Sequence, residues 1–304
     1  MTDDSPPHGT KNTAQLFGGP WSVVKIEIIE KYLRAYTAAL KKQAFKLTYI
    51  DAFAGSGLFS FDDEEFPLFL DSDAAKQEHE GSARRALAVT PPFDEIIFID
   101  ESAANVAALN GIIGGRPGAL AKRGDANVIV SGLCDPQDWR PKGRRGVIFL
   151  DPFGLNVNWA TLEAIRRSTV LDVWYLFSLC GLYRNAPLSF ARLTPDKIAA
   201  VARALGELDW PDRFYAAQPA LSAGPDLFGA VAPLGGKSRF LDVNAMEAYV
   251  MRRLSSLFPR VLRPRRFHGP TGAPLFSLFF AMANPDAPAV ALATKIAQHI
   301  LKTT

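Results

Sequence analysis

The chain has 304 residues, of which 48% are hydrophobic and 21% are charged, and its formal net charge is +3. This composition is sufficient for a full hydrophobic core and excludes collagens, coiled coils and predominantly disordered proteins. The longest apolar runs fall short of the ~18 residues that cross a bilayer, so no membrane segment is predicted. The polar start of the chain does not resemble a signal peptide. We therefore expect a soluble, cytoplasmic protein.

Residues 1–20 are rich in Pro, Gly, Asn and Thr, which predicts a flexible N-terminal arm before one domain at 21–304. From Trp21 to Lys42 apolar residues recur every four positions, which predicts a helix. The strands predicted after it are Lys46–Ile50, Glu95–Ile99, Ala119–Lys122, Gly146–Leu150, Asp172–Phe177, Arg260–Phe267 and Leu275–Ala283. The further predicted helices are Ser82–Val89, Ser102–Ile112, Trp159–Ser168, Pro195–Leu205, Val243–Leu257 and Ala287–Leu301.

The alternation of these strands and helices predicts a parallel sheet with helices on both faces. The last two strands are joined only by the short segment His268–Ala273, which suits an antiparallel hairpin. This layout indicates an α/β, Rossmann-like fold of the class I methyltransferase type. We expect a mostly parallel seven-stranded sheet that ends in an antiparallel hairpin.

Two segments interrupt the alternation and are predicted to be insertions. Residues 59–80 are strongly acidic, with eight acids against one lysine. Residues 185–236 are rich in Pro, Gly and aromatic residues and are long enough to form a lid or a recognition module.

The first strand after the N-terminal helix leads into a motif of small residues, Asp-Ala-Phe-Ala-Gly-Ser-Gly at 51–57. In open α/β sheets, ligands bind at the carboxyl ends of the strands, and glycine allows a tight turn and a close backbone approach. An ordinary glycine turn is the alternative. The string resembles the first motif of S-adenosylmethionine-dependent methyltransferases, particularly those that modify amino groups of nucleic-acid bases. The resemblance implies that Asp51, Phe53, Ala54, Gly55 and Gly57 hold the cofactor.

In that motif a helix follows the glycine loop directly, whereas here the acidic segment comes first. We therefore expect the first helix after the loop to be displaced.

Acids also follow the next two predicted strands. Asp100 ends the second strand and could accept hydrogen bonds from the ribose hydroxyls of a nucleoside, or it could cap the following helix. Asp125 follows the third strand, where the methyltransferase pattern places a group that contacts adenine. An Asp/Asn turn is the alternative for Asp125.

The fourth strand ends in Asp151-Pro152-Phe153-Gly154-Leu155. Base amino-methyltransferases carry an acid or amide, two prolines and an aromatic residue at this point. The resemblance implies that Asp151 accepts a hydrogen bond from the methyl-accepting amine, and that Phe153 stacks on an extruded base beside Pro152. The second proline is missing here. The alternative is a simple strand-to-helix turn.

Basic residues suggest a polyanionic substrate. Six arginines and no acid occur within 252–266, and Arg184 follows the fifth strand. We predict that Arg184, Arg263, Arg265 and Arg266 contact substrate phosphates. The alternative is that these arginines are solvated and cover neighbouring apolar side chains.

Metal chemistry is not expected. The four histidines are scattered, and Cys134 and Cys180 cannot form a Cys-rich zinc site or a disulfide framework.

Further strings complete a resemblance to one family. They are Trp21–Leu40 with Lys25, Gly81-Ser82-Ala83, Gly146–Leu155 with Trp159, Trp174–Phe177, Arg184 and Leu275–Pro285. The chain resembles three-Cys-motif partner proteins from about Gly19 to Leu301, and Asp-Pro-Phe-Gly-Leu is the most specific string. The resemblance implies a class I methyltransferase-like fold. It also implies a separate partner protein with clustered cysteines, of the radical-SAM type.

Three functions fit these observations. The first is an S-adenosylmethionine-dependent methyltransferase that acts on a nucleic acid, most plausibly at a base amino group. The second is a methyltransferase-like, cofactor-binding regulatory partner of the three-Cys-motif protein. The third is a methyltransferase with a protein substrate.

Overall fold

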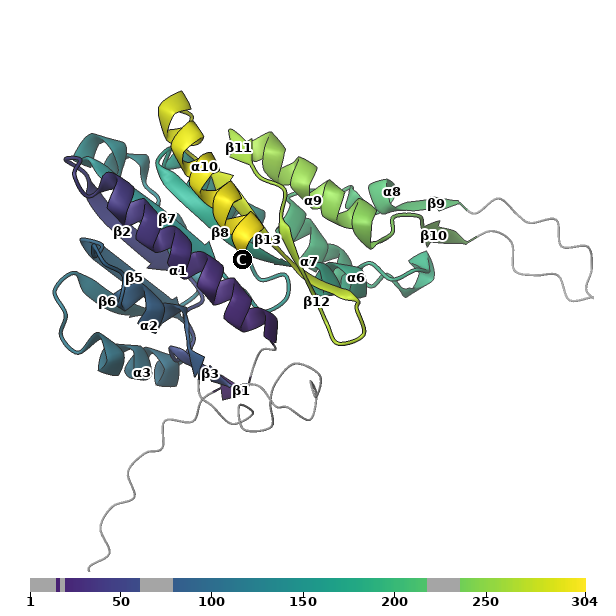
Figure 1. The fold of residues 1–304 in the computed structure, drawn as a ribbon. Coiled ribbons are helices and arrows are strands. Elements are labelled where there is room, and N and C mark those ends of the chain that lie inside the picture. Colours follow the sequence, from purple (N-terminus) through teal and green to yellow (C-terminus); the bar gives the residue numbers. More distant parts are fainter. Residues whose placement is uncertain (1–14, 17–19, 61–78, 218–235) are drawn as a thin grey trace, which may run out of the picture.

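A mixed sheet forms the centre of the fold (Figure 1). The computed structural model describes residues 15–16, 20–60, 79–217 and 236–304. The parallel strands are β2 (Lys46–Asp51), β5 (Glu95–Asp100), β6 (Ala119–Arg123), β7 (Arg144–Leu150) and β8 (Leu171–Ser178). The antiparallel strand β13 (Pro274–Met282) continues the sheet, and β11 (Arg260–Val261) and β12 (Arg265–His268) pair with its other side. The strand order is β6-β5-β2-β7-β8-β13, with β11 and β12 at the far edge.

This order confirms the predicted fold class. β2, the first strand of the sheet, lies in its middle, and the chain continues to one side through β5 and β6, then to the other through β7 and β8. All five strands are parallel, as the helical crossovers require. The closing strand is antiparallel, as the short 268–273 connection predicts. The crevice of such a sheet lies where the strand order reverses, next to β2.

The edge strand predicted over Arg260–Phe267 is in two pieces. β11 lies opposite Ala281–Met282, and β12 lies opposite the first half of β13. Pro264 stands between them and has no N–H to contribute to the ladder. The two short strands therefore occupy the single edge position that the sequence predicts.

The helices cover both faces of the sheet. One face carries α1 (Pro20–Leu40), α2 (Ser82–Leu87), α3 (Ala103–Ile113) and α10 (Ala287–Thr303). The other carries α4 (Ala126–Leu133), α5 (Trp159–Arg167), α6 (Leu179–Asn185), α7 (Pro195–Leu205), α8 (Trp210–Phe214) and α9 (Val243–Leu257). Successive strand residues enter opposite cores, so that Tyr49 packs under α1 and Ile50 packs on the other side. Figure 1 shows α1 and α10 side by side across the sheet.

The predicted insertion at 185–236 contributes to the packed domain. Its helices α7 and α8 bury Val201, Trp210 and Phe214 in the core beneath the sheet. The short strands β9 (Tyr215–Ala217) and β10 (Lys237–Arg239) pair antiparallel beyond it. Residues 218–235 lie outside the described part of the chain.

The two ends of the acidic insertion lie side by side. Strands β3 (Leu58–Ser60) and β4 (His79–Glu80) pair antiparallel, and the Gly81 N–H donates to the Gly57 carbonyl at 2.9 Å. Helix α2 therefore starts at Ser82, directly beside the glycine loop. The acidic segment separates this helix from the loop in sequence but not in the folded structure, so the expected displacement is not found. Residues 61–78, between these two strands, lie outside the described residues.

The predicted arm at 1–20 is described only at Pro20, where α1 begins, and at β1 (Gln15–Leu16), which pairs in parallel with β3. Within the described ranges, no helix has both the length and the apolar character that a bilayer crossing requires.

Candidate functional site

Three acids lie at the carboxyl edge of the sheet, as the motifs predict. Asp51 ends the central strand β2, where it pairs with Phe98 of β5 on one side and Phe149 of β7 on the other. Asp100 and Asp151 each lie two residues beyond these partners, past the end of the pairing. The structure therefore brings the acids from three separate motifs to one edge, next to the point where the strand order reverses.

The loop after β2 is held by its neighbours on both sides. The Ala52 N–H donates to the Phe149 carbonyl, and the Ala54 N–H donates to the Ile99 carbonyl, both at 3.0 Å. Gly55 and Gly57 adopt φ angles of 61° and 81°, which disfavour residues with a Cβ. The loop is therefore a fixed turn over the edge of the sheet.

The glycine loop also fits tightly against the helices behind it. A Cβ at Gly57 would lie 2.7 Å from Ile112 Cδ1, and a Cβ at Gly81 would lie 2.9 Å from the Gly57 carbonyl carbon. Side chains at either position would push the loop away from α2 and α3. Phe53 is half-buried at the front of the loop and packs against the core beneath the sheet.

Asp100 connects the glycine loop to α3. Its Oδ2 accepts from the Gly55 N–H at 3.0 Å, and its Oδ1 accepts from the Ser102 N–H at 2.8 Å and from Asn105 Nδ2 at 3.0 Å. Ser102 supplies the N-cap of α3. The carboxylate remains half-exposed, and Oδ2 accepts one hydrogen bond from the described part of the chain, so it can accept another from a ligand hydroxyl.

Asp125 lies past β6, exposed at the start of α4. Its carboxylate accepts from the Asn127 N–H at 2.6 Å and forms the N-cap of that helix. The turn expected as an alternative is therefore present, and the carboxylate remains open to solvent. Asn127 in turn ties α4 to the loop after β7, because its Oδ1 accepts from the Asn158 N–H at 2.9 Å.

Asp51 is the most deeply placed of the acids. It has no exposed surface, and its Oδ1 has no hydrogen-bond partner among the described residues. Tyr49 donates to its Oδ2 at 3.3 Å. Burial, aided by the nearby Asp151, raises the pKa of Asp51 to about 7, while contacts from Ser82 and Phe53 oppose that shift. Asp51 is therefore fully enclosed at the end of β2, where the glycine loop begins.

Lys25 of α1, which the family resemblance singles out without a role, reaches the acceptor motif. Its Nζ lies 2.5 Å from Asp151 Oδ2, and the side chains are 9% and 23% exposed. Lys25 stands three residues before the buried Ile28, on the apolar stripe of α1. A lysine on the buried stripe of a helix needs an acid nearby, and that is the sequence signal that could have indicated this pair.

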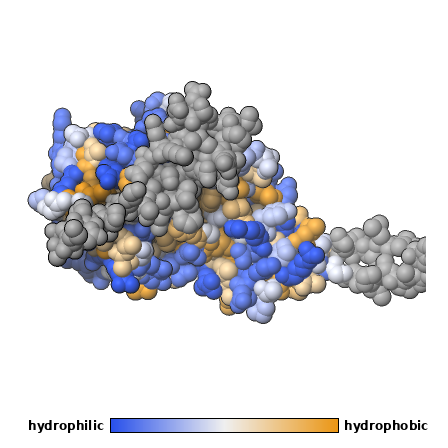
Figure 2. Space-filling model, turned by 90° about the horizontal axis from the view of Figure 1, so that it is seen from below, coloured by the Kyte–Doolittle hydropathy of each residue, from blue (hydrophilic) through white to orange (hydrophobic). Residues whose placement is uncertain are grey.

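The acceptor loop presents an aromatic ring at the surface. Pro152 is buried, whereas Phe153 is 65% exposed. The loop runs close to α6, because a Cβ at Gly181 would lie 3.5 Å from the Gly154 Cα. Next along α6, Tyr183 is 47% exposed and Arg184 is exposed. Figure 2 views the molecule from below and shows hydrophobic and hydrophilic residues interspersed over the part of the surface that is drawn in colour.

The predicted arginine patch lies on the far border of the sheet, with β8 and β13 between it and β7. Arg265 lies opposite Leu278, which pairs with Leu176 near the carboxyl end of β8, and Arg263 lies farther from that edge on the same border. Arg266 is engaged by Glu247, with 3.1 Å between Nε and Oε1, and by Asn244. Arg263 is exposed and Arg265 is half-exposed. Arg184 lies on α6, directly after β8, the strand that pairs with β7.

No family model matches the chain, and no curated protein matches it in sequence. Solved structures with a similar backbone include the protein LPL1258 from Legionella pneumophila, of family DUF519, at 13% identity and a TM-score of 0.49. The match covers 93% of this chain and 91% of that one. A putative RNA methyltransferase from Pyrococcus horikoshii matches at 12% identity and a TM-score of 0.32, over 84% of each chain. A complex of DhpI with SAH matches at 10% identity and a TM-score of 0.29, over 88% of this chain and 100% of that one.

Proposed function

We propose that the chain is an S-adenosylmethionine-dependent methyltransferase that acts on an amino group of a nucleic-acid base. The observation that carries the cofactor assignment is the 3.0 Å contact between the Gly55 N–H and Asp100 Oδ2. It joins a positive-φ glycine loop to a strand-end carboxylate at the reversal point of the sheet, where a nucleoside-containing ligand fits.

The residues of this edge suit the two ends of that cofactor. Asp100 has a carboxylate oxygen available for the ribose hydroxyls, and the exposed Asp125 lies where the adenine end would extend. The loop 53–57 would hold the methionine end with its backbone, because its glycines leave no side chain in the way. When bound, the cofactor supplies an electrophilic methyl group on a sulfonium.

The protein's own task is to position the acceptor, because methyl transfer is an in-line displacement. Lys25 holds Asp151 through Oδ2, which leaves Oδ1 to accept a hydrogen bond from an acceptor amine. That hydrogen bond orients the amine and raises the electron density on its nitrogen. The exposed ring of Phe153 offers a stacking surface for a base taken out of its stack.

Nearby exposed groups support a polymeric substrate. Tyr183 and Arg184 follow β8 on the side of the acceptor loop. An aromatic ring and a cation at this spacing suit the stacking and phosphate contacts of a single strand. We therefore propose a single-stranded or flipped-out base as the acceptor.

A second candidate function is a methyltransferase-like regulatory partner of a three-Cys-motif protein. The observation that favours it is the Lys25–Asp151 ion pair, because the proposed acceptor carboxylate is already neutralised within the chain. In this case the chain would bind the cofactor but would not transfer its methyl group. A protein acceptor, the partner included, is the third case.

Calorimetric titration with S-adenosylmethionine and S-adenosylhomocysteine tests the cofactor site. We expect micromolar binding that Asp100→Ala weakens at least ~10-fold, while Glu101→Ala, an exposed neighbour, binds as the wild type does. Absence of binding by the folded wild-type protein would contradict the proposal.

Transfer of a labelled methyl group to DNA, RNA or protein then separates the three functions. A base methyltransferase labels nucleic acid and loses this activity in Asp151→Ala. Binding without transfer to any acceptor supports the regulatory partner, and transfer to protein alone supports the third case.

A further inference from the structure

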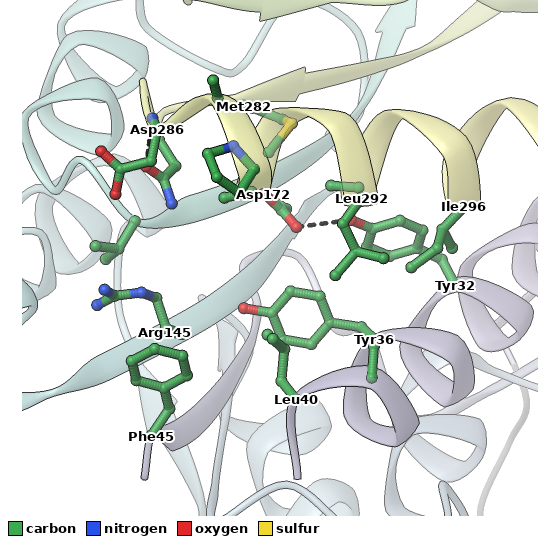
Figure 3. Close-up of a pocket in the computed structure, with 17 residues that line it drawn as sticks. Tyr32, Tyr36, Leu40, Phe45, Arg145, Asp172, Met282, Asp286, Leu292 and Ile296 are labelled. Atoms are coloured by element: carbon green, nitrogen blue, oxygen red, sulfur yellow. Dashed lines mark hydrogen bonds between the residues drawn. The ribbon is translucent and has the colours of Figure 1, made fainter. Parts of the chain in front are cut away.

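A cavity opens at the amino edge of the sheet, opposite the candidate site. It has a volume of about 490 Å³ and lies between the second half of α1 and the start of α10, with β7 and β8 beneath it (Figure 3). Its wall is mainly apolar and includes Leu40 of α1, Phe45 before β2, and Leu292 and Ile296 of α10. Clefts of this size are typical of small-molecule sites. None of the proposed cofactor or acceptor residues lines it.

Arg145 is the one cationic side chain among the residues that line the cavity, beside the acids Asp172 and Asp286. Arg145 lines the floor, with its guanidinium 4.4 Å from the centre of the Phe45 ring. Its one hydrogen bond within the described structure goes to the Arg144 carbonyl, at 2.8 Å, and it makes no ion pair there. A guanidinium has five N–H donors, so most of its capacity is available to a ligand. Burial lowers the pKa of Arg145, which shows that the charge is partly removed from water.

The nearest exposed acid is already paired. Asp286, at the start of α10, lies 2.7 Å from Arg140. The Asp286 carboxylate accepts no hydrogen bond from the first turn of α10, and that turn, the positive end of the helix, lines the cavity at Ala287 and Ala289. Both features favour an anionic group at this end of the cavity.

Two nearly buried oxygen groups face the middle of the cavity. Tyr36 is 5% exposed, its hydroxyl points into the cavity in Figure 3, and no hydrogen bond to it occurs among the described residues. Asp172 is 4% exposed and accepts from the Tyr32 hydroxyl at 2.6 Å. The Tyr36 hydroxyl is therefore available to bond with a ligand in the cavity.

The spacing of these groups sets the size of the ligand. Asp172 of β8 lies opposite Val147 of β7. Arg145 lies two residues before Val147 on β7, so its side chain is on the same face of the sheet. The strand geometry places their backbones about 7 Å apart along the sheet and about 5 Å across it. A planar ligand of one or two rings is of a size that can contact both groups.

We propose that this cavity binds a small aromatic monocarboxylic acid. The carboxylate pairs with Arg145 at the start of α10, and the ring lies between Tyr36 and the apolar face of Leu292 and Ile296. The Tyr36 hydroxyl donates to the carboxylate or to a ring substituent. A cationic ligand is disfavoured, because it would meet Arg145 and the positive end of α10.

Calorimetry with three ligands of one shape tests the charge: 2-naphthoate, 2-naphthamide and 2-naphthylmethylamine. We expect the carboxylate to bind, and the amide and the amine to bind at least ~10-fold more weakly. Equal binding of the amide, preference for the amine, or no naphthoate binding at millimolar concentration would each overturn the proposal.

Variants then locate the site. Arg145→Gln is expected to weaken naphthoate binding at least ~10-fold, and Leu292→Trp is expected to abolish it by filling the cavity. Arg260→Gln, an exposed arginine on β11, serves as the matched control and binds as the wild type does. Unchanged naphthoate binding in both cavity variants would overturn the proposal. S-adenosylhomocysteine binding, measured in the same samples, reports separately on the opposite edge.

Discussion

Lys25 Nζ lies 2.5 Å from Asp151 Oδ2, although 126 residues separate the two in the chain. The contact fastens α1 to the loop after β7, at the edge where the acceptor would bind. Lys25 is the more buried partner, at 9% side-chain exposure against 23% for Asp151. The Lys25 ammonium therefore needs its partner more than the Asp151 carboxylate does, because water reaches the carboxylate more easily.

This asymmetry predicts unequal costs for breaking the pair. Asp151→Ala leaves a buried ammonium without a partner, and we expect the free energy of unfolding to fall by about 3 kcal/mol. Lys25→Met keeps the volume of the side chain and leaves an acid that water can reach, so a loss of about 1–2 kcal/mol is expected. Urea unfolding measures both. Lys31→Met, which breaks the exposed Lys31–Glu27 pair, is the control and should cost below about 0.5 kcal/mol. A larger loss in Lys25→Met than in Asp151→Ala would contradict this account.

The glycine loop predicts opposite effects for two alanine substitutions. Gly81→Ala places a Cβ 2.9 Å from the Gly57 carbonyl carbon, so the loop must move and binding of S-adenosylhomocysteine should weaken at least ~10-fold. Gly111 lies within α3 with no atom near an added Cβ. Gly111→Ala should therefore raise the free energy of unfolding by about 0.5–1 kcal/mol and leave binding unchanged. Calorimetry and urea unfolding of both proteins provide the measurements, and normal binding in Gly81→Ala would show that the contact does not shape the site.

Two buried acids predict a pH dependence of stability. Burial raises the pKa values of Asp51 and Asp172 to about 7, from ~3.9 in an unfolded chain. Between these values the folded state binds more protons than the unfolded state, so the free energy of unfolding should fall as the pH rises from 5 to 7. Each acid contributes a slope of up to about 1.4 kcal/mol per pH unit, which disappears above about pH 8.

Asp172→Asn isolates one of these contributions. The amide oxygen can still accept from Tyr32, but the side chain no longer titrates. We expect the stability of this variant relative to the wild type to improve by about 1 kcal/mol or more between pH 5 and pH 8. Glu163→Gln, at an exposed site on α5, should follow the wild-type curve. Parallel curves for Asp172→Asn and the wild type would mean that Asp172 is ionised throughout this range.

The arginine patch predicts different roles for neighbouring residues. If the protein binds nucleic acid along the sheet border, Arg263→Gln should reduce the slope of log affinity against log salt by about 1, because Arg263 is exposed. Arg266→Gln should instead lower the free energy of unfolding and leave the slope unchanged, since Arg266 is bound to Glu247. Filter binding at several salt concentrations, combined with unfolding curves, distinguishes the two. A change of slope in Arg266→Gln alone would reverse the assignment.

The strands, most helices and the carboxyl-edge acids could be predicted because each depends on a local pattern. An apolar run followed by an acid specifies both the strand and the place where the acid emerges, as at Asp51, Asp100 and Asp151. The short helices α4, α6 and α8 were missed, because five to eight residues give too few turns for a periodic signal.

Contacts between distant segments could not be predicted from such patterns. The partner of Lys25 is set by how α1 crosses the sheet, and the cavity beside Arg145 is set by the spacing of α1 and α10. The place of α2 beside the glycine loop depends on the contact between Gly57 and Gly81, which their separation along the chain does not indicate.

The hydrogen bond from the Gly81 N–H to the Gly57 carbonyl closes the base of the acidic segment. Once the ends of a flexible loop are fixed, its closure entropy grows only with the logarithm of its length, by about 0.6 kcal/mol for each doubling. A change in the number of residues between Gly57 and Gly81 would therefore leave the glycine loop and α2 joined at the same point.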